Sequence, residues 1–246
     1  MTTSEGAVYD LGYQPFEGEH RGRKGAWITV WAEGLRRILG IRRKARRKIM
    51  PWLLVAIALI PSIIGVGVAF ILPAPVAEGV DLASQNADFF ALGGTIAMLF
   101  TALAAPELLI PDRRDGVLSM LSSRPLTSTD YLTARFASLL TVVGAFLLLP
   151  QAVLFAGQVG TDPEGLAKGI VNAADTLPKI LVVAAIYVIA YVPLGFAVAS
   201  LSNRKAIAAS VYLAGMIALT AFAEVIVRNA VFDGARWFAL IAPINT

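Results

Sequence analysis

Five long stretches of this chain carry almost no charge, and this pattern limits the fold more than any other feature of the sequence. A helix needs about 20 apolar residues to cross roughly 30 Å of hydrocarbon, and each stretch is close to or above that length. The stretches are apolar on every side instead of alternating, which favours helices over the strands of a membrane barrel. The predicted spans are residues 51–72, 89–110, 136–158, 180–202 and 206–227.

The composition agrees with a chain that folds in lipid. Hydrophobic residues make up 57% of the 246 residues and charged residues 15%, whereas about a quarter of an average soluble domain is charged. A soluble domain of this size has too little interior to bury so much apolar surface. We therefore expect an all-α, polytopic bundle of membrane helices, with residues 51–246 as its transmembrane domain.

Two segments precede the first predicted span. Residues 1–23 are polar and without period, which is typical of a flexible leader. Residues 24–50 place apolar side chains, Trp27 and Trp31 among them, at helical spacing beside a basic cluster. This pattern predicts an amphipathic helix on the membrane surface, with its basic face against anionic headgroups. Nucleic-acid binding is not favoured, because the cluster directly adjoins an apolar span. The basic residues expected at the headgroups include Arg36, Arg37, Arg42 and Arg43.

The placement of lysine and arginine predicts the orientation, because these residues concentrate in cytoplasmic loops. With the N-terminus inside, seventeen of the 21 basic residues lie on the cytoplasmic side and four on the outer side. The first outer loop has three acidic residues and no basic one. We therefore expect a multi-pass protein of the plasma membrane with a cytoplasmic N-terminus.

The last residues form an unusual ending. Five spans place the C-terminus outside, yet residues 237–246 are again uncharged and mostly apolar. Ten residues are too few to cross a bilayer as a helix. We interpret them as an interfacial or re-entrant piece, or as the start of a sixth span in a chain that has been cut short, and favour the last.

Some kinds of chemistry are disfavoured by what the sequence lacks. There is no cysteine, which excludes disulfides, thiolate nucleophiles and cysteine-based metal sites. The single histidine, His20, lies in the polar leader and is expected to be a solvated bystander. No G-x-x-x-x-G-K-[ST] pattern occurs, so we expect no phosphate-binding loop, no cofactor and no metal site in this chain. Gly65 and Gly67, and the pair Gly93 and Gly94, are expected to permit close helix packing.

The segment between the second and third predicted spans carries the most information. Glu107 is expected to leave the membrane, and the charged turn that follows is expected to lie in water. Leu118 and Leu121 then belong to a short apolar stripe, which predicts an amphipathic helix parallel to the membrane that Pro125 cannot continue. The charged turn consists of Asp112, Arg113, Arg114 and Asp115.

The next helix is expected to begin at a cap formed by Thr127 or Ser128. The residues alone leave the loop before it with two interpretations. It is either a linker that merely joins two spans, or a docking helix for a cytoplasmic partner.

Charged and polar residues in or beside the spans are functional candidates, because such groups are costly at membrane depth. Glu107 and Arg135 lie at the same end of spans two and three, so we predict that they pair across the two helices. Glu224 and Arg228 are four residues apart on one helix face, which predicts a local salt bridge or the lining of a substrate exit. Gln151 either hydrogen-bonds to a neighbouring helix or faces a cavity.

The loop between spans two and three resembles the corresponding loop of the ABC-2 type permease family, the membrane subunits of ATP-binding-cassette exporters. In that family an acidic exit from the second span is followed by an Asp/Arg-rich turn, a glycine, a short leucine-rich helix, Ser-Arg-Pro-Leu and an Asp-Tyr start of span three. The order of elements is similar from about residue 24 to residue 228, and residues 24–50 resemble the elbow helix. The matching residues are Glu107, Asp112, Arg113, Arg114, Gly116, Leu118, Ser123, Arg124, Pro125, Leu126, Asp130 and Tyr131.

The resemblance implies a function and a set of partners. The loop would hold a coupling helix, with Asp112 to Leu121 seated in a groove of a separate ATPase subunit. ATP and its Mg²⁺ would bind to that subunit, so this chain would be a transport subunit and not an enzyme. A second permease copy or a homologue would complete the exporter. The family normally has six spans, and no residue identifies the substrate.

Two other classes of function are alternatives. One is a membrane scaffold or assembly factor without transport, which the same bundle of spans would suit. The other is a membrane-embedded, lipid-modifying enzyme, which would need acidic, basic or metal-binding side chains converging at one depth. The sequence shows no such Asp, Glu and His cluster.

Overall fold

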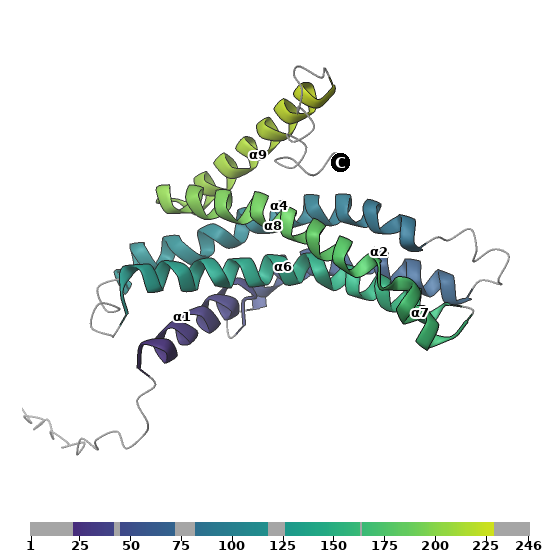
Figure 1. Ribbon diagram of the computed structural model, residues 1–246. Helices are drawn as coiled ribbons and strands as arrows, with labels where there is room; N and C mark the ends of the chain where they lie inside the picture. The colour runs from purple at the N-terminus through teal and green to yellow at the C-terminus, as the bar shows by residue number, and fades with distance from the viewer. Residues whose placement is uncertain (1–21, 42–44, 72–81, 118–125, 163, 229–246) are drawn as a thin grey trace, which may run out of the picture.

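The computed structural model describes residues 22–41, 45–71, 82–117, 126–162 and 164–228, and these residues form seven helices and no strand (Figure 1). Five of the helices are long and apolar enough to cross a membrane, namely α2, α4, α6, α8 and α9. Each of the five predicted spans therefore corresponds to one helix. The helices are α1 (Gly22–Ile38), α2 (Ala45–Ile71), α4 (Leu82–Arg114), α6 (Ser128–Gly160), α7 (Leu166–Ala173), α8 (Thr176–Leu201) and α9 (Lys205–Arg228).

Two of the long helices extend well beyond their predicted spans. Helix α4 continues to Arg114 instead of ending at residue 110, and α6 begins at Ser128 instead of residue 136. The early start of α6 follows from its cap: the Thr127 hydroxyl accepts from the backbone N–H of Asp130, whose carboxylate accepts from the N–H of Thr127. The predicted cap at Thr127 or Ser128 is thus confirmed at Thr127. Hydropathy does not predict the end of α4 or the start of α6, because the residues there are polar.

The core lies among α4, α6 and α8, whose facing side chains form one buried cluster. Helix α4 is the most buried of the five long helices, whereas α2 and α9 expose most of their side chains. The exposed residues of α2 are large and apolar, for example Trp52, Ile64 and Phe70. Such exposure is costly in water but not in lipid, because lipid tails are as apolar as the side chains.

One of the predicted glycine contacts is confirmed. A Cβ atom at Gly94 of α4 would lie 2.1 Å from the ring of Tyr187 on α8, so only glycine permits this approach. Gly93 is in ordinary contact with Leu147, and nothing lies within 4 Å of a Cβ at Gly67, so Gly67 is not at a close helix contact in the described part of the chain.

Helix α1 runs beside the first third of α6 (Figure 1). The indole N–H of Trp27 donates to the Thr133 hydroxyl at 3.1 Å, and that of Trp31 donates to the Thr141 hydroxyl at 3.3 Å. Gly34 makes this packing close, because a Cβ there would lie 2.3 Å from the Ser138 hydroxyl oxygen. Trp27 and Trp31 of α1 therefore contact α6, and the placement of this helix on the membrane surface stays a prediction.

Candidate functional site

A cluster of charged side chains is buried where α4 ends and α6 begins. These two helix ends lie at the left in Figure 1. Its centre is Asp112 in the last turn of α4, whose side chain is 1% exposed. One carboxylate oxygen accepts from Arg37 of α1 at 2.5 Å. The other accepts from Arg135 of α6 at 2.7 Å and from the Tyr131 hydroxyl at 2.6 Å. One carboxylate thus holds three helices together.

A second carboxylate completes a closed arrangement. Glu33 of α1 accepts from Arg37 at 3.0 Å, one helical turn away, and from Arg135 at 2.5 Å. Each arginine therefore bridges the same two carboxylates, and each carboxylate bridges the same two arginines. We call this set the ionic ring, and its members are Glu33, Arg37, Asp112 and Arg135.

The ionic ring has no net charge, because its two carboxylates pair with its two guanidinium groups. This pairing offsets the free-energy cost of burying the charges. Arg135 and Arg37 are 4% and 12% exposed, whereas Glu33 keeps 44% of its side chain in contact with solvent. Taking an unpaired ion out of water costs several kcal/mol, so each buried charge needs an opposite partner with good geometry. Arg135 gains a further contact, since its guanidinium lies 5.5 Å from the centre of the Tyr131 ring.

Arg113 fixes the same end of α4 to α8. Its guanidinium donates to the carbonyl oxygens of Ala199 and Ser202 at 2.7 Å each, and also to that of Ser200. The last carbonyls of a helix have no partner within the helix, and a cation there also complements the helix dipole. Two consecutive residues of α4, Asp112 and Arg113, therefore connect this helix to α1, α6 and α8.

The predicted pair between Glu107 and Arg135 was wrong. Glu107 pairs with Lys205 at the start of α9, and Arg135 pairs with Asp112 and Glu33. The reason is helical geometry: Glu107 and Asp112 are five residues apart, which separates them by about 140° around the α4 axis. Asp112 therefore points toward α6, whereas Glu107 points toward α9.

Two other expectations for this region are corrected. Asp112 was expected in water but is buried, because α4 continues through it and α1 covers it. Arg37 was expected at lipid headgroups but points into the ionic ring, whereas Arg36 is exposed as expected. Arg114 and Asp115 are exposed, and the chain leaves α4 at Gly116, whose φ of +67° favours glycine.

Several predicted residues add nothing to this cluster. The Gln151 side chain of α6 is fully buried within the helical bundle, so it does not face lipid. Glu224 of α9 is half-buried. The predicted contact of Glu224 with Arg228 involves a side chain outside the described part of the structure. Other predictions fall outside the described residues altogether, namely those on residues 1–21, Arg42, Arg43, Leu118, Leu121, Arg124, Pro125 and 237–246.

The sequence also pointed to Arg135 but missed Glu33, the second acidic member of the ring. One signal was available, because Glu33 and Arg37 are four residues apart on a predicted helix and carry opposite charges. Within the described ranges no three acidic or histidine side chains converge as metal ligands would. The arrangement is suited to holding helices in register and to moving them as one unit.

Comparisons with protein-family models, curated proteins and solved structures find no match to this chain. The fold and the site by themselves define a helical protein with five helices able to span a membrane, joined at one end by buried ion pairs.

Proposed function

We propose that this chain is the permease subunit of an ABC-type exporter in the plasma membrane, with its N-terminus in the cytoplasm. A separate subunit would bind ATP and Mg²⁺ and hydrolyse the nucleotide, and a second permease copy or a homologue would complete the transporter. The resemblance of the loop after Glu107 supports the class. The distribution of lysine and arginine supports the orientation.

The observation that carries the proposal is the ionic ring beside Gly116. A coupling segment must pass its movement to the membrane helices, and this requires a stiff connection on both sides of the loop. Asp112 precedes the loop and Arg135 follows it, and the two are joined directly at 2.7 Å. A force on residues 116–127 would therefore act on α4 and α6 together, with α1 attached through Arg37.

Arg113 extends the same connection to α8. Because its guanidinium spans the last carbonyls of α8, the end of that helix would follow α4 when the loop is displaced. A rigid-body movement of packed helices is one of the known motions of switching proteins, since packed cores do not deform continuously. The proposed elbow role of α1 fits this scheme, because α1 would move with α6.

The proposal is tested by the partner that the loop captures. We expect a protein with a phosphate-binding loop to copurify when the tagged full-length chain is extracted from its native membranes. The double substitution Leu118→Asp and Leu121→Asp should lower its recovery at least tenfold, because it removes two residues of the apolar stripe that the sequence predicts there. The matched control is Leu166→Asp with Val171→Asp, two exposed residues of α7, which should leave recovery unchanged.

Two outcomes would count against the exporter. One is that no ATPase accompanies the wild-type chain, and the other is that the loop variant retains as much ATPase as the α7 control. Capture of a protein without a nucleotide site through the same loop would instead favour the scaffold or assembly factor.

A further inference from the structure

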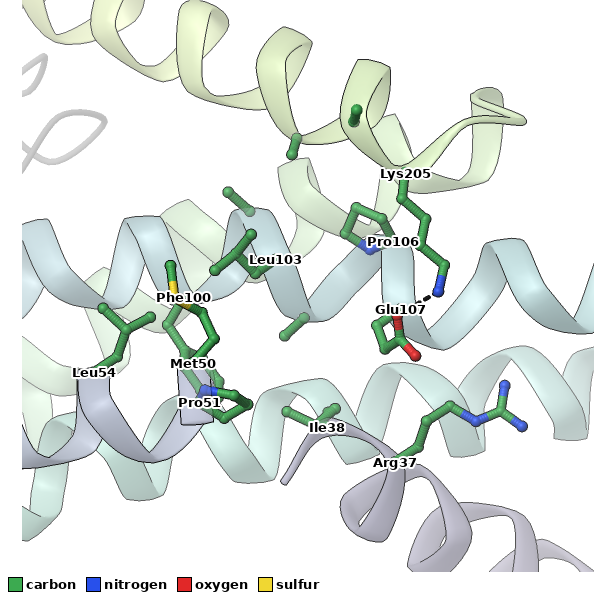
Figure 2. A pocket seen from close by; sticks show the side chains of 14 residues that line it. Arg37, Ile38, Met50, Pro51, Leu54, Phe100, Leu103, Pro106, Glu107 and Lys205 are labelled. Atoms are coloured by element: carbon green, nitrogen blue, oxygen red, sulfur yellow. Dashed lines mark hydrogen bonds and ion pairs between the residues drawn. The ribbon is translucent and has the colours of Figure 1, made fainter. Parts of the chain in front are cut away.

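A cavity of about 360 Å³ opens between α1, α2, α4 and α9 (Figure 2). Met50 and Leu54 of α2 line it together with Phe100 and Leu103 of α4. Its volume lies within the range of small-molecule sites. Arg37 of the ionic ring lines this cavity, but no residue of the proposed coupling segment, 112–121, does.

The cavity is apolar along one part and charged at the other. Leu54, Phe100 and Met50 line the apolar part, while Arg37, Glu107 and Lys205 lie at the charged end (Figure 2). Arg37 lies in the last turn of α1 and Lys205 is the first residue of α9, whereas the apolar part lies among helices that can span a membrane. This change in polarity along one cavity matches a molecule with an apolar chain and a charged headgroup.

A second cavity of about 520 Å³ continues the charged end, and the two share Arg37, Glu107, Lys205 and Ala206. Its walls contain four basic residues, Arg37, Arg114, Arg204 and Lys205, and three acidic ones, Glu107, Asp112 and Asp115.

The charges already in use decide which headgroup suits this second cavity. Asp112 is paired with Arg37, and Glu107 with Lys205. Arg114 and Arg204 form no ion pair with any described residue. The guanidinium groups left available can recognise a phosphate group, because their planar donors match its oxygens.

We infer that these two joined cavities bind an anionic phospholipid, with its phosphate at Arg114 and Arg204 and an acyl chain against Met50, Leu54 and Phe100. A zwitterionic lipid is disfavoured, because Arg114 and Arg204 outnumber Asp115, the one acidic residue of this wall that forms no ion pair with a described residue, so an added cation would be repelled. A free phosphate would leave the apolar cavity unfilled. The inference concerns a bound lipid and does not depend on transport.

The test measures lipid binding to the delipidated full-length protein in detergent, by native mass spectrometry and by thermal unfolding. The probes are phosphatidylglycerol, phosphatidylcholine, a six-carbon-chain phosphatidylglycerol and inorganic phosphate. We expect long-chain phosphatidylglycerol to bind the wild type with at least tenfold higher affinity than phosphatidylcholine does. It should also raise the unfolding temperature more. The short-chain lipid should be weaker, because it fills less of the apolar cavity.

The variants test the headgroup site separately from the fold. Arg114→Gln and Arg204→Gln should each weaken phosphatidylglycerol binding about fivefold, and together about thirtyfold. Both side chains are exposed, so the variants should unfold at the wild-type temperature without lipid. The control is Lys168→Gln in α7, which also removes an exposed charge and should leave the affinity unchanged.

Three results would overturn the inference. They are equal affinity for the two headgroups, unchanged affinity in the double arginine variant, and inorganic phosphate that stabilises as well as the long-chain lipid. The last result would indicate an anion site without a lipid.

Discussion

Asp112 is the residue on which most contacts of the candidate site depend. It accepts from two guanidinium groups and one phenol while almost wholly excluded from solvent. Asp115, three positions later, is exposed. The two carboxylates differ in surroundings and not in chemistry, so they form a matched pair for experiment.

Asp112→Asn should destabilise the protein by about 3–5 kcal/mol, because Arg37 and Arg135 would each keep a buried charge with one partner fewer. For a chain of this length, that loss corresponds to a fall of roughly 10 °C in apparent Tm. Thermal unfolding in detergent measures it, with Asp115→Asn as the control. Equal small effects of both variants would show that the ionic ring does not stabilise the fold.

At the scale of helices, the docking of α1 on α6 depends on a close approach at one point. Gly34 lies against Ser138, and the Ser138 hydroxyl donates to the carbonyl of Trp31 at 2.9 Å. Trp27 and Trp31 then add their indole donors on one side, and Arg23 forms a two-pronged pair with Asp130 at 2.7 and 2.8 Å. The close approach at Gly34 and these polar contacts together hold α1 against α6.

Gly34→Ala should loosen α1, because the new methyl group would lie 2.3 Å from the Ser138 oxygen. Helix propensity alone predicts the opposite, since alanine is the better helix former by roughly 1 kcal/mol. Limited trypsin digestion measures the effect as faster cleavage at Arg23 and Lys24.

Two further variants check that steric crowding is the cause. Adding Ser138→Gly should restore slow cleavage, because it removes both atoms nearest to the new methyl group. Gly67→Ala in α2 should have no effect, since nothing lies near it. Faster cleavage in Gly67→Ala, or no change in Gly34→Ala, would contradict this account.

The helices were largely predictable from the sequence, and the ionic ring was not. Apolar runs near 20 residues indicated all five long helices, and the pair Thr127 and Ser128 indicated the cap of α6, which the structure places at Thr127. Hydropathy predicted that Asp112 lies in water, because a hydropathy scale does not include ion pairs with residues far away in the sequence. Its partner Arg37 is 75 positions away, and a single sequence holds no signal for a pair at that separation.

At the scale of the whole molecule, α6 runs the length of the bundle, so its two ends lie on opposite sides (Figure 1). Asp115 lies near the start of α6, and Glu164 follows its end. The orientation that we propose places Asp115 in the cytoplasm and Glu164 outside. The absence of native cysteine makes this orientation simple to test, because every labelled thiol would be an introduced one.

Glu164→Cys should react with a membrane-impermeant maleimide in intact cells, because the proposed orientation exposes it outside. Asp115→Cys should react only after the membrane is permeabilised. Mass-tag gel shifts measure both, with the cysteine-free parent as the blank. The reverse pattern would invert the orientation, and labelling of both sites in intact cells would contradict a span between them.

The docking of α1 against α6 also sets an order of events during synthesis. Asp130, the partner of Arg23, lies 107 positions further along the chain. At about 5–20 residues per second, it leaves the ribosome roughly 5–20 s after Arg23. Asp112 follows Arg37 by 75 positions and Arg135 follows Glu33 by 102. Until they emerge, Arg37 has only Glu33, on its own helix, as an ionic partner in the ring. The ionic ring can therefore close only after the start of α6, the third long helix, has been made.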